Sequence, residues 1–237
     1  MIARLCLVEL RKLVDTISGA ALIGVGAVLA GVFGGGALLL RPGVSFSEVA
    51  QLAGVPGGTL VTVMAILLVT AERSHHTALV TYIVTPRRQW VAAAKAVAAA
   101  TIALVVVVFA VAAATVIVPV GTLVTGDEAN WSVDAAALAC WAAGTVIGAL
   151  SGWALGLAIG NAPAAIVLVL AWPMVTGLLT NVPALAPVLP WLDSTAVSGF
   201  GDGIDPGDLG RFFSGLAAWV AVPGAVGLLR TMRQEVR

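Results

Sequence analysis

The sequence predicts an all-α integral membrane protein with six transmembrane helices, an N-terminal interfacial elbow helix and short re-entrant helices between the fifth and sixth spans. Hydrophobic residues make up 60% of the 237 residues, charged residues make up 10%, and the mean hydropathy is +1.06. Charged residues approach about 25% in soluble domains, so the composition excludes an ordinary soluble protein. The apolar stretches are continuous rather than alternating, which favours helices over the strands of a membrane barrel.

The first predicted element is an interfacial helix at residues 1–15. At about 100° per residue, most of its apolar side chains, Leu5 and Val8 excepted, share one side and most of its charged side chains gather opposite. The apolar side holds Ile2, Cys6, Leu7, Leu10, Leu13 and Val14, and the charged side holds Arg4, Arg11, Lys12 and Asp15. This pattern is typical of a helix lying in the cytoplasmic membrane interface. The same residues also fit a simple basic anchor that orients the first span.

Five uncharged stretches supply the six predicted spans, because one of them is long enough for two. The stretch from Ala135 to Leu192 has no charged residue and would be about 87 Å long as one helix, so it must turn back. The turn is predicted at Gly160–Pro163. The spans are then expected at about 17–40, 51–71, 93–120, 135–159, 162–180 and 212–229, all within one transmembrane domain covering residues 1–237.

Two features of the spans and their connections stand out. Five glycines recur at every fourth residue of the fourth span, which predicts a smooth strip against which another helix packs. The same glycine pattern also fits a surface along which a neighbouring helix slides during a conformational cycle. These are Gly144, Gly148, Gly152, Gly156 and Gly160. Residues 181–211 are broken by Pro183, Pro187 and Pro190, which predicts short re-entrant or interfacial helices, or else a plain connector with an apolar patch.

The basic residues predict the orientation. With six spans both termini share a side, and that side holds ten of the twelve Lys and Arg residues, so both termini are expected in the cytoplasm. Only Arg41 and Arg211 lie opposite. The net charge is zero, which argues against a nucleic-acid-binding protein.

The predicted span interiors contain no ionisable residue. Glu72, His75, His76 and Lys95 come nearest the membrane, all at its cytoplasmic surface. This argues against an ion-coupled carrier and against an intramembrane enzyme. The first three share a helix face, yet three neighbours on one helix rarely complete a metal site, so no metal is expected. Cys6 and Cys140 show no ligand or redox spacing and are interpreted as packing residues.

The connection between the second and third spans carries the most varied chemistry. Leu79, Tyr82 and Ile83 fall on one face at i, i+3 and i+4, so a short helix would present an apolar ridge to a cytoplasmic partner until Pro86 ends it. Arg87 and Arg88 follow at the headgroup level. An amphipathic loop resting on lipid is the alternative.

This connection resembles the membrane (permease) subunits of type-2 ABC exporters, particularly their short actinobacterial forms. That family has a Glu at the end of the second span, then His-Gly-Thr, an apolar stretch, Thr-Pro-Arg-Arg and a Lys opening the third span. The corresponding residues here are Glu72, His75, Thr77, Thr85, Pro86, Arg87, Arg88 and Lys95. His76 stands where the family usually has Gly, and Arg73 where an aromatic is common. The N-terminal segment with Arg4, Glu9, Arg11 and Lys12 is similar to the family's elbow helix, and residues 181–211 to its re-entrant pair.

The resemblance implies a coupling loop that docks into a separate ATP-binding subunit. Its residues would be Glu72, His75, Thr77, Leu79, Tyr82, Ile83, Pro86, Arg87 and Arg88. The sequence agrees with a separate ATPase, because neither lysine belongs to a phosphate loop: Lys12 follows Arg11, and Lys95 sits between alanines. ATP and Mg are therefore expected on the partner chain, with no cofactor and no covalent chemistry on this one.

The expected function is export of an amphipathic compound, such as a drug, an antimicrobial peptide or a lipid-like molecule, across a bacterial cytoplasmic membrane. Such export would contribute to drug or antimicrobial resistance. The chain would act with a second copy of itself or a homologous permease. The first alternative is a non-transporting membrane anchor or sensor subunit of an ATP-driven complex. The second is an ion-coupled secondary carrier, which would need no ATP.

Overall fold

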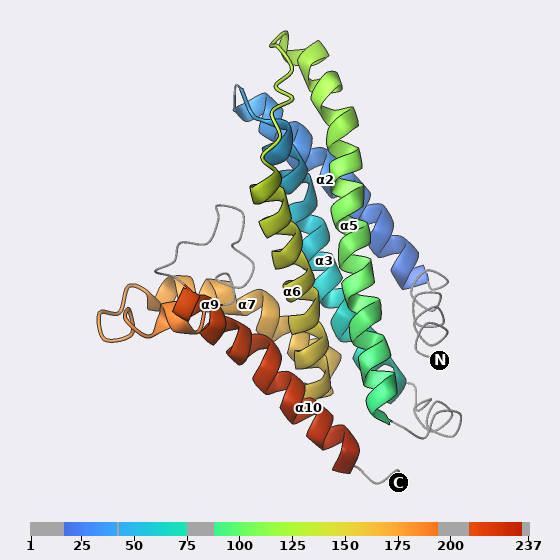
Figure 1. The fold of residues 1–237 in the computed structure, drawn as a ribbon, viewed down its shortest axis with the longest axis vertical. Coiled ribbons are helices and arrows are strands. Elements are labelled where there is room, and N and C mark those ends of the chain that lie inside the picture. The colour runs from blue at the N-terminus through green and yellow to red at the C-terminus, as the bar shows by residue number, and fades with distance from the viewer. Residues whose placement is uncertain (1–16, 42, 75–87, 194–208, 234–237) are drawn as a thin grey trace.

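The computed structural model describes residues 17–41, 43–74, 88–193 and 209–233, and the regular structure in these ranges is entirely helical (Figure 1). The long helices are α2 (Ile17–Leu40), α3 (Phe46–Ser74), α5 (Arg88–Thr125), α6 (Ala135–Ile159) and α7 (Ala162–Leu179). A 3₁₀ turn, η1 (Leu189–Trp191), follows α7. The last helical stretch is divided into α9 (Leu209–Leu216), the π-helical η4 (Ala217–Ala221) and α10 (Val222–Arg233).

Five helices in the described ranges are long and apolar enough to cross a membrane. They are Phe46–Ala71, Gln89–Thr125, Ala135–Ile159, Ala162–Leu179 and Leu209–Met232. The described side chains of α2 add a shorter apolar helix, Gly24–Leu40. The protein is thus an all-helical, multi-pass membrane protein by the length and composition of its helices. The predicted interfacial helix at residues 1–15 lies outside the described residues.

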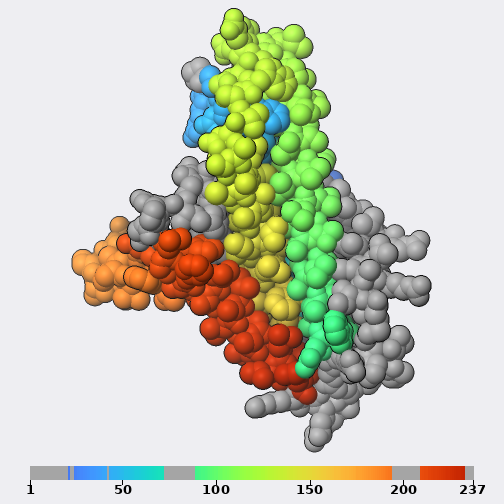
Figure 2. All heavy atoms as spheres, viewed as in Figure 1, coloured from blue at the N-terminus to red at the C-terminus, as the bar shows by residue number. Residues whose placement is uncertain are grey.

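Helices α2, α3, α5 and α6 form an elongated bundle, from which α7 and the α9–α10 stretch diverge to one side (Figure 1). Buried residues make up 56% of the apolar window of α3 and 50% of that of α6, against 11% for α7. Helix α3 packs against α2, α5 and α6, and α10 crosses the C-terminal part of α6 (Figure 2). The core therefore lies around α3 and α6, and most of α7 faces away from it.

The predicted turn between the fourth and fifth spans is confirmed. Gly160 ends α6 in the left-handed conformation, with φ 71° and its N–H bonded to the Gly156 carbonyl. Asn161 then caps α7, because its side-chain oxygen accepts the Ala164 N–H at 3.1 Å. Adjacent C-cap and N-cap residues reverse the chain within two positions. Both helices consequently match their predicted bounds to within one residue.

Helix α5 is longer than the predicted span at 93–120. Its 38 residues extend about 57 Å, nearly twice the thickness of about 30 Å of a bilayer core. The helix continues through Gly121. A Cβ at that position would lie 2.5 Å from a Leu38 side-chain carbon, so the glycine permits close contact with α2. The helix ends at Gly126, which has φ 77°.

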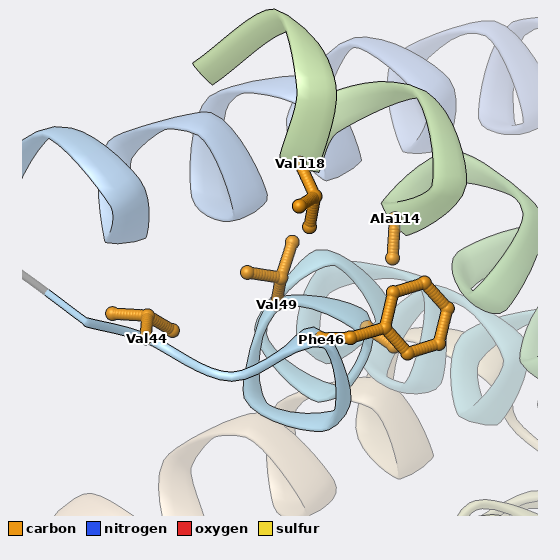
Figure 3. Close-up of a cluster of buried hydrophobic side chains, with 6 residues drawn as sticks. Val44, Phe46, Val49, Ala114 and Val118 are labelled. Carbon is orange, nitrogen blue, oxygen red and sulfur yellow. The ribbon is translucent and has the colours of Figure 1, made fainter. Parts of the chain in front are cut away.

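Two clusters of buried side chains hold the bundle together. In the first, at the start of α3, Val49 points toward Val118 and the ring of Phe46 lies beside Ala114 (Figure 3). The second joins α3, α5 and α6 and consists largely of small residues: Val61, Ala65, Ala99, Ala103 and Ala149. Small side chains let helix backbones approach closely, which is the usual basis of helix association in lipid.

The last part of the chain departs from the prediction. Residues 180–188 form successive hydrogen-bonded turns that lead into η1, because the prolines prevent a continuous helix. Residues 194–208 lie outside the description, so the predicted re-entrant helices stay a prediction. The sixth span, expected as one regular helix at 212–229, contains the π-helical η4 near its middle.

Candidate functional site

At one end of the bundle, hydrogen bonds between described residues join helices near the start of α5 and the end of α6. Lys95 Nζ donates to the Leu68 carbonyl of α3 at 2.7 Å. Trp153 Nε1 of α6 donates to the Ala92 carbonyl at 3.0 Å. The other two bonds reach α10: Gln89 Nε2 donates to Met232 Sδ at 3.1 Å, and Arg230 donates to the Ala158 carbonyl at 2.8 Å. We call these eight residues the α5-end cluster.

Lys95 is the most constrained member of this cluster. Its side chain is 4% exposed and lies between α3 and α5, where Ala94, Ala98 and Ala99 leave room for close helix contact. An ammonium group held away from water needs hydrogen-bond acceptors, and the Leu68 carbonyl supplies one. Lys95 was expected to open the third span at the cytoplasmic surface. It also links that span to the preceding one.

The α5-end cluster lies on both sides of the predicted coupling loop. Helix α3 ends at Ser74, six residues after Leu68, and α5 begins at Arg88, seven residues before Lys95. Glu72 lies in the last turn of α3, and its side chain, like that of Arg88, is outside the description. The remaining predicted loop residues also lie outside the described ranges: His75, Thr77, Leu79, Tyr82, Ile83, Pro86 and Arg87. So do the predicted elbow residues Arg4, Glu9, Arg11 and Lys12.

The glycine run of α6 lies largely against α3, and the two helices run parallel. A Cβ on Gly152 would overlap the Thr62 carbonyl, and one on Gly156 would lie 3.3 Å from Ile66 Cα. Gly144 is also buried. The contact at Gly148 is looser, because a Cβ added there would lie 3.5 Å from Thr62 Oγ1. Gly160 is outside the helix as its C-cap.

A cavity of about 490 Å³ opens beside this helix contact. Its walls come from α3, α6, α7 and the π-helical η4. The described lining residues are Gly54, Val55, Gly58, Thr59, Thr62, Trp141, Thr145, Gly148, Ser151, Val169, Leu170, Pro173 and Trp219. None of these residues is charged. The volume falls in the range of about 300–1,000 Å³ that is usual for small-molecule sites.

Trp219 connects the cavity to the rest of the molecule. Its indole N–H donates to the Leu192 carbonyl at 3.0 Å, and the indole of Trp172 on α7 donates to the same carbonyl at 3.2 Å. The two rings pack 5.4 Å apart. Ser151 Oγ of α6 donates to the Trp219 carbonyl at 3.4 Å within η4. Single-turn π-helices occur frequently at functional sites.

The cavity and the Trp219 contacts were not predicted from the sequence. Leu192 is 20 residues from Trp172 and 27 residues from Trp219 along the chain, and no periodic pattern links the three. The glycine run was the available signal for the cavity, but it indicated close packing and not where the packing stops. Among the described residues, no group of three or more His, Cys, Asp or Glu side chains is placed to hold a metal ion.

No protein-family model, curated protein or solved structure matches this chain. The functional assignment therefore depends on the residues themselves and on their placement in the fold.

Proposed function

We propose that the chain is the membrane subunit of an ATP-driven exporter, with six spans, an N-terminal interfacial helix and both termini in the cytoplasm. It works with a separate ATPase subunit and moves an amphipathic compound across a bacterial cytoplasmic membrane. The coupling residues lie between α3 and α5. The five long apolar helices support a membrane-embedded role, and the loop pattern from Glu72 to Lys95 supports the exporter class.

The observation that carries the proposal is the α5-end cluster. A transporter driven by a soluble partner must pass a displacement of its cytoplasmic loop to the spans. Lys95 joins the two helices that flank the loop, Trp153 joins α5 to α6, and Arg230 joins α6 to α10. A force applied where α3 ends and α5 begins therefore reaches four spans through direct hydrogen bonds.

The cavity favours transport over anchoring. An anchor or sensor subunit needs the loop but no space inside its bundle, whereas this chain has about 490 Å³ of uncharged cavity beside α3 and α6. In an exporter, two copies of the chain, or one copy and a homologous permease, assemble with two ATPases. We expect the end with the α5-end cluster to be cytoplasmic, because the basic residues Arg88, Arg230 and Arg233 lie at the helix ends there.

Purification of the tagged chain from its host in mild detergent tests the proposal. We expect an ATP-binding subunit to co-purify with the unmodified chain and to be lost when Leu79, Tyr82 and Ile83 are all changed to Asp. The matched control is a second triple change to Asp at the other end of α5. It uses the exposed residues Leu123, Val124 and Val133 and should retain the ATPase.

One result would refute the exporter assignment: a chain that purifies without any ATPase under conditions that keep other membrane complexes intact. Loss of the ATPase with the control triple change as well as with the loop change would remove the evidence for a loop contact, because the loss would then reflect a damaged fold.

A further inference from the structure

We infer that the cavity between α3, α6, α7 and Trp219 is a binding site for a single hydrocarbon chain, either the tail of a free amphipathic compound or an acyl chain of a lipid. This site deepens the proposed function and depends on it for its role in export. It names the part of an amphipathic substrate that the subunit holds, and the residues that hold it.

The polar atoms of the lining have no need of a ligand. The four lining hydroxyls each donate to a backbone carbonyl: Thr59 to Val55, Thr62 to Gly58, Thr145 to Trp141, and Ser151 to Trp219. The Trp219 indole donates to Leu192. Among the described residues, every buried side-chain nitrogen and oxygen has a partner. The described lining offers no charged group and no free hydroxyl donor to a polar ligand, only the acceptor lone pairs of these oxygens, whereas a hydrocarbon chain needs neither.

The length of the cavity matches one leaflet of a bilayer. Its lining extends along α3 from Gly54 to Thr62 and along α6 from Trp141 to Ser151. At 1.5 Å per residue these segments are about 12 and 15 Å long. Half of a hydrocarbon core of about 30 Å is about 15 Å. Because α3 and α6 run parallel, the cavity is elongated along the direction in which lipid tails lie.

Glycines create the space. A Cβ on Gly58 would lie 3.8 Å from a Thr145 carbon, and one on Gly148 would lie 3.5 Å from Thr62 Oγ1. Both distances are ordinary van der Waals contacts, so these positions accept a larger side chain that then occupies the cavity. At Gly152 a Cβ would overlap the Thr62 backbone, so that position does not accept a larger side chain.

The site lies near the middle of α3 and α6. Its α3 lining ends at Thr62, six residues before Leu68 of the α5-end cluster, and its α6 lining ends at Ser151, two residues before Trp153. On both helices the cavity is therefore within two helical turns of the cluster. Trp219 forms one wall and is bonded to both α6 and Leu192, so movement of α10 relative to α6 would change the width of the cavity.

Photolabelling of the full chain in lipid nanodiscs, without any ATPase, tests the inference. The probe is a long-chain fatty acid with a diazirine on the chain, and a phosphatidylcholine with the same group on one acyl chain distinguishes a free compound from a bilayer lipid. Adducts are mapped by mass spectrometry. We expect them in the peptides containing Gly54–Thr62 and Trp141–Ser151, above the level on exposed α5 residues such as Val105 and Val108.

The variants Gly148→Leu and Gly58→Leu fill the cavity from opposite walls. Each should lower the yield of cavity adducts by about tenfold or more, because a loss of about 1.4 kcal/mol in binding free energy lowers the affinity tenfold. If one variant fails to fold, the other provides the test. Gly177→Leu is the matched control, because Gly177 is exposed on α7 and a Cβ there meets nothing within 4 Å. It should leave the adducts unchanged.

Two outcomes would overturn the inference: adducts confined to the lipid-facing surface of α5, or cavity adducts that both filling variants leave unchanged. Because no ATPase is present, the result is independent of the co-purification experiment. If the cavity is labelled but no ATPase co-purifies with the chain, the exporter function is refuted and the site stands. If an ATPase co-purifies but the cavity is not labelled, the site is refuted and the exporter function stands.

Discussion

At the scale of single residues, the glycines of α6 separate into three roles that the sequence shows as one repeat. Gly152 and Gly156 lie against the backbone of α3, Gly148 borders the cavity, and Gly160 ends the helix. The repeat could be read from the sequence because small residues at every fourth position form one strip. The division of roles could not, because it depends on where α3 approaches α6 and where it leaves.

The contrast between Gly152 and Gly148 gives a stability prediction. Gly152→Ala should destabilise the protein by about 1–3 kcal/mol, because its methyl group meets the Thr62 backbone and α3 must shift. Gly148→Ala, one helical turn earlier, should be neutral or stabilise the helix by up to about 1 kcal/mol. Thermal unfolding of both variants in detergent, followed by tryptophan fluorescence, measures the difference. Equal melting temperatures would refute the helix contact described.

At the scale of helices, local capping explains what could be predicted. The bounds of α6 and α7 follow from Asp134, Gly160 and Asn161, whose cap preferences are visible in the sequence. The length of α5 does not follow from the sequence, because the close contact of Gly121 with Leu38 depends on where α2 lies. No signal in the sequence indicated the π-helical η4, whose Trp219 is bonded to Ser151 of α6 and to Leu192.

The Trp172 and Trp219 contacts predict strong non-additivity. Each indole donates to the Leu192 carbonyl. After Trp172→Phe or Trp219→Phe alone, this carbonyl still accepts one indole hydrogen bond, so either single change should lower stability only slightly. The double variant removes both, and its effect should exceed the sum of the single effects by about 0.5–3 kcal/mol. Hydrogen exchange of residues 181–193 provides the readout. Strictly additive changes would show that the two indoles do not share a structural role.

At the scale of the whole molecule, the two ends of the bundle differ. The predicted cytoplasmic end holds α3, α5, α6 and α10 together through the α5-end cluster, while α7 and η4 diverge around the cavity. The sequence indicated the helical membrane class and the position of the loop, because hydropathy and charge are local properties. The cavity could not be predicted, because four segments distant in sequence form its walls.

Lys95 gives a prediction about the whole assembly. Lys95→Met removes the donor to Leu68 while leaving unchanged the loop residues that we propose to contact an ATPase. The ATPase should therefore still co-purify, but ATP-driven transport should fall by about tenfold, because a hydrogen bond to a charged group contributes about 1.5–3 kcal/mol. Arg41→Met, an exposed basic residue at the other end of the bundle, is the control and should transport normally. Normal transport by the Lys95 variant would remove the cluster from the coupling route.

The most direct measurement is transport by the purified complex of this chain and its ATPase in sealed vesicles, with a fluorescent single-chain amphipathic compound as substrate. We expect movement of the compound that requires ATP and Mg on the side of the proposed coupling loop and that the loop triple change to Asp abolishes. Movement driven by an ion gradient without ATP, or ATP hydrolysis with no movement of any amphipathic compound tested, would contradict this expectation.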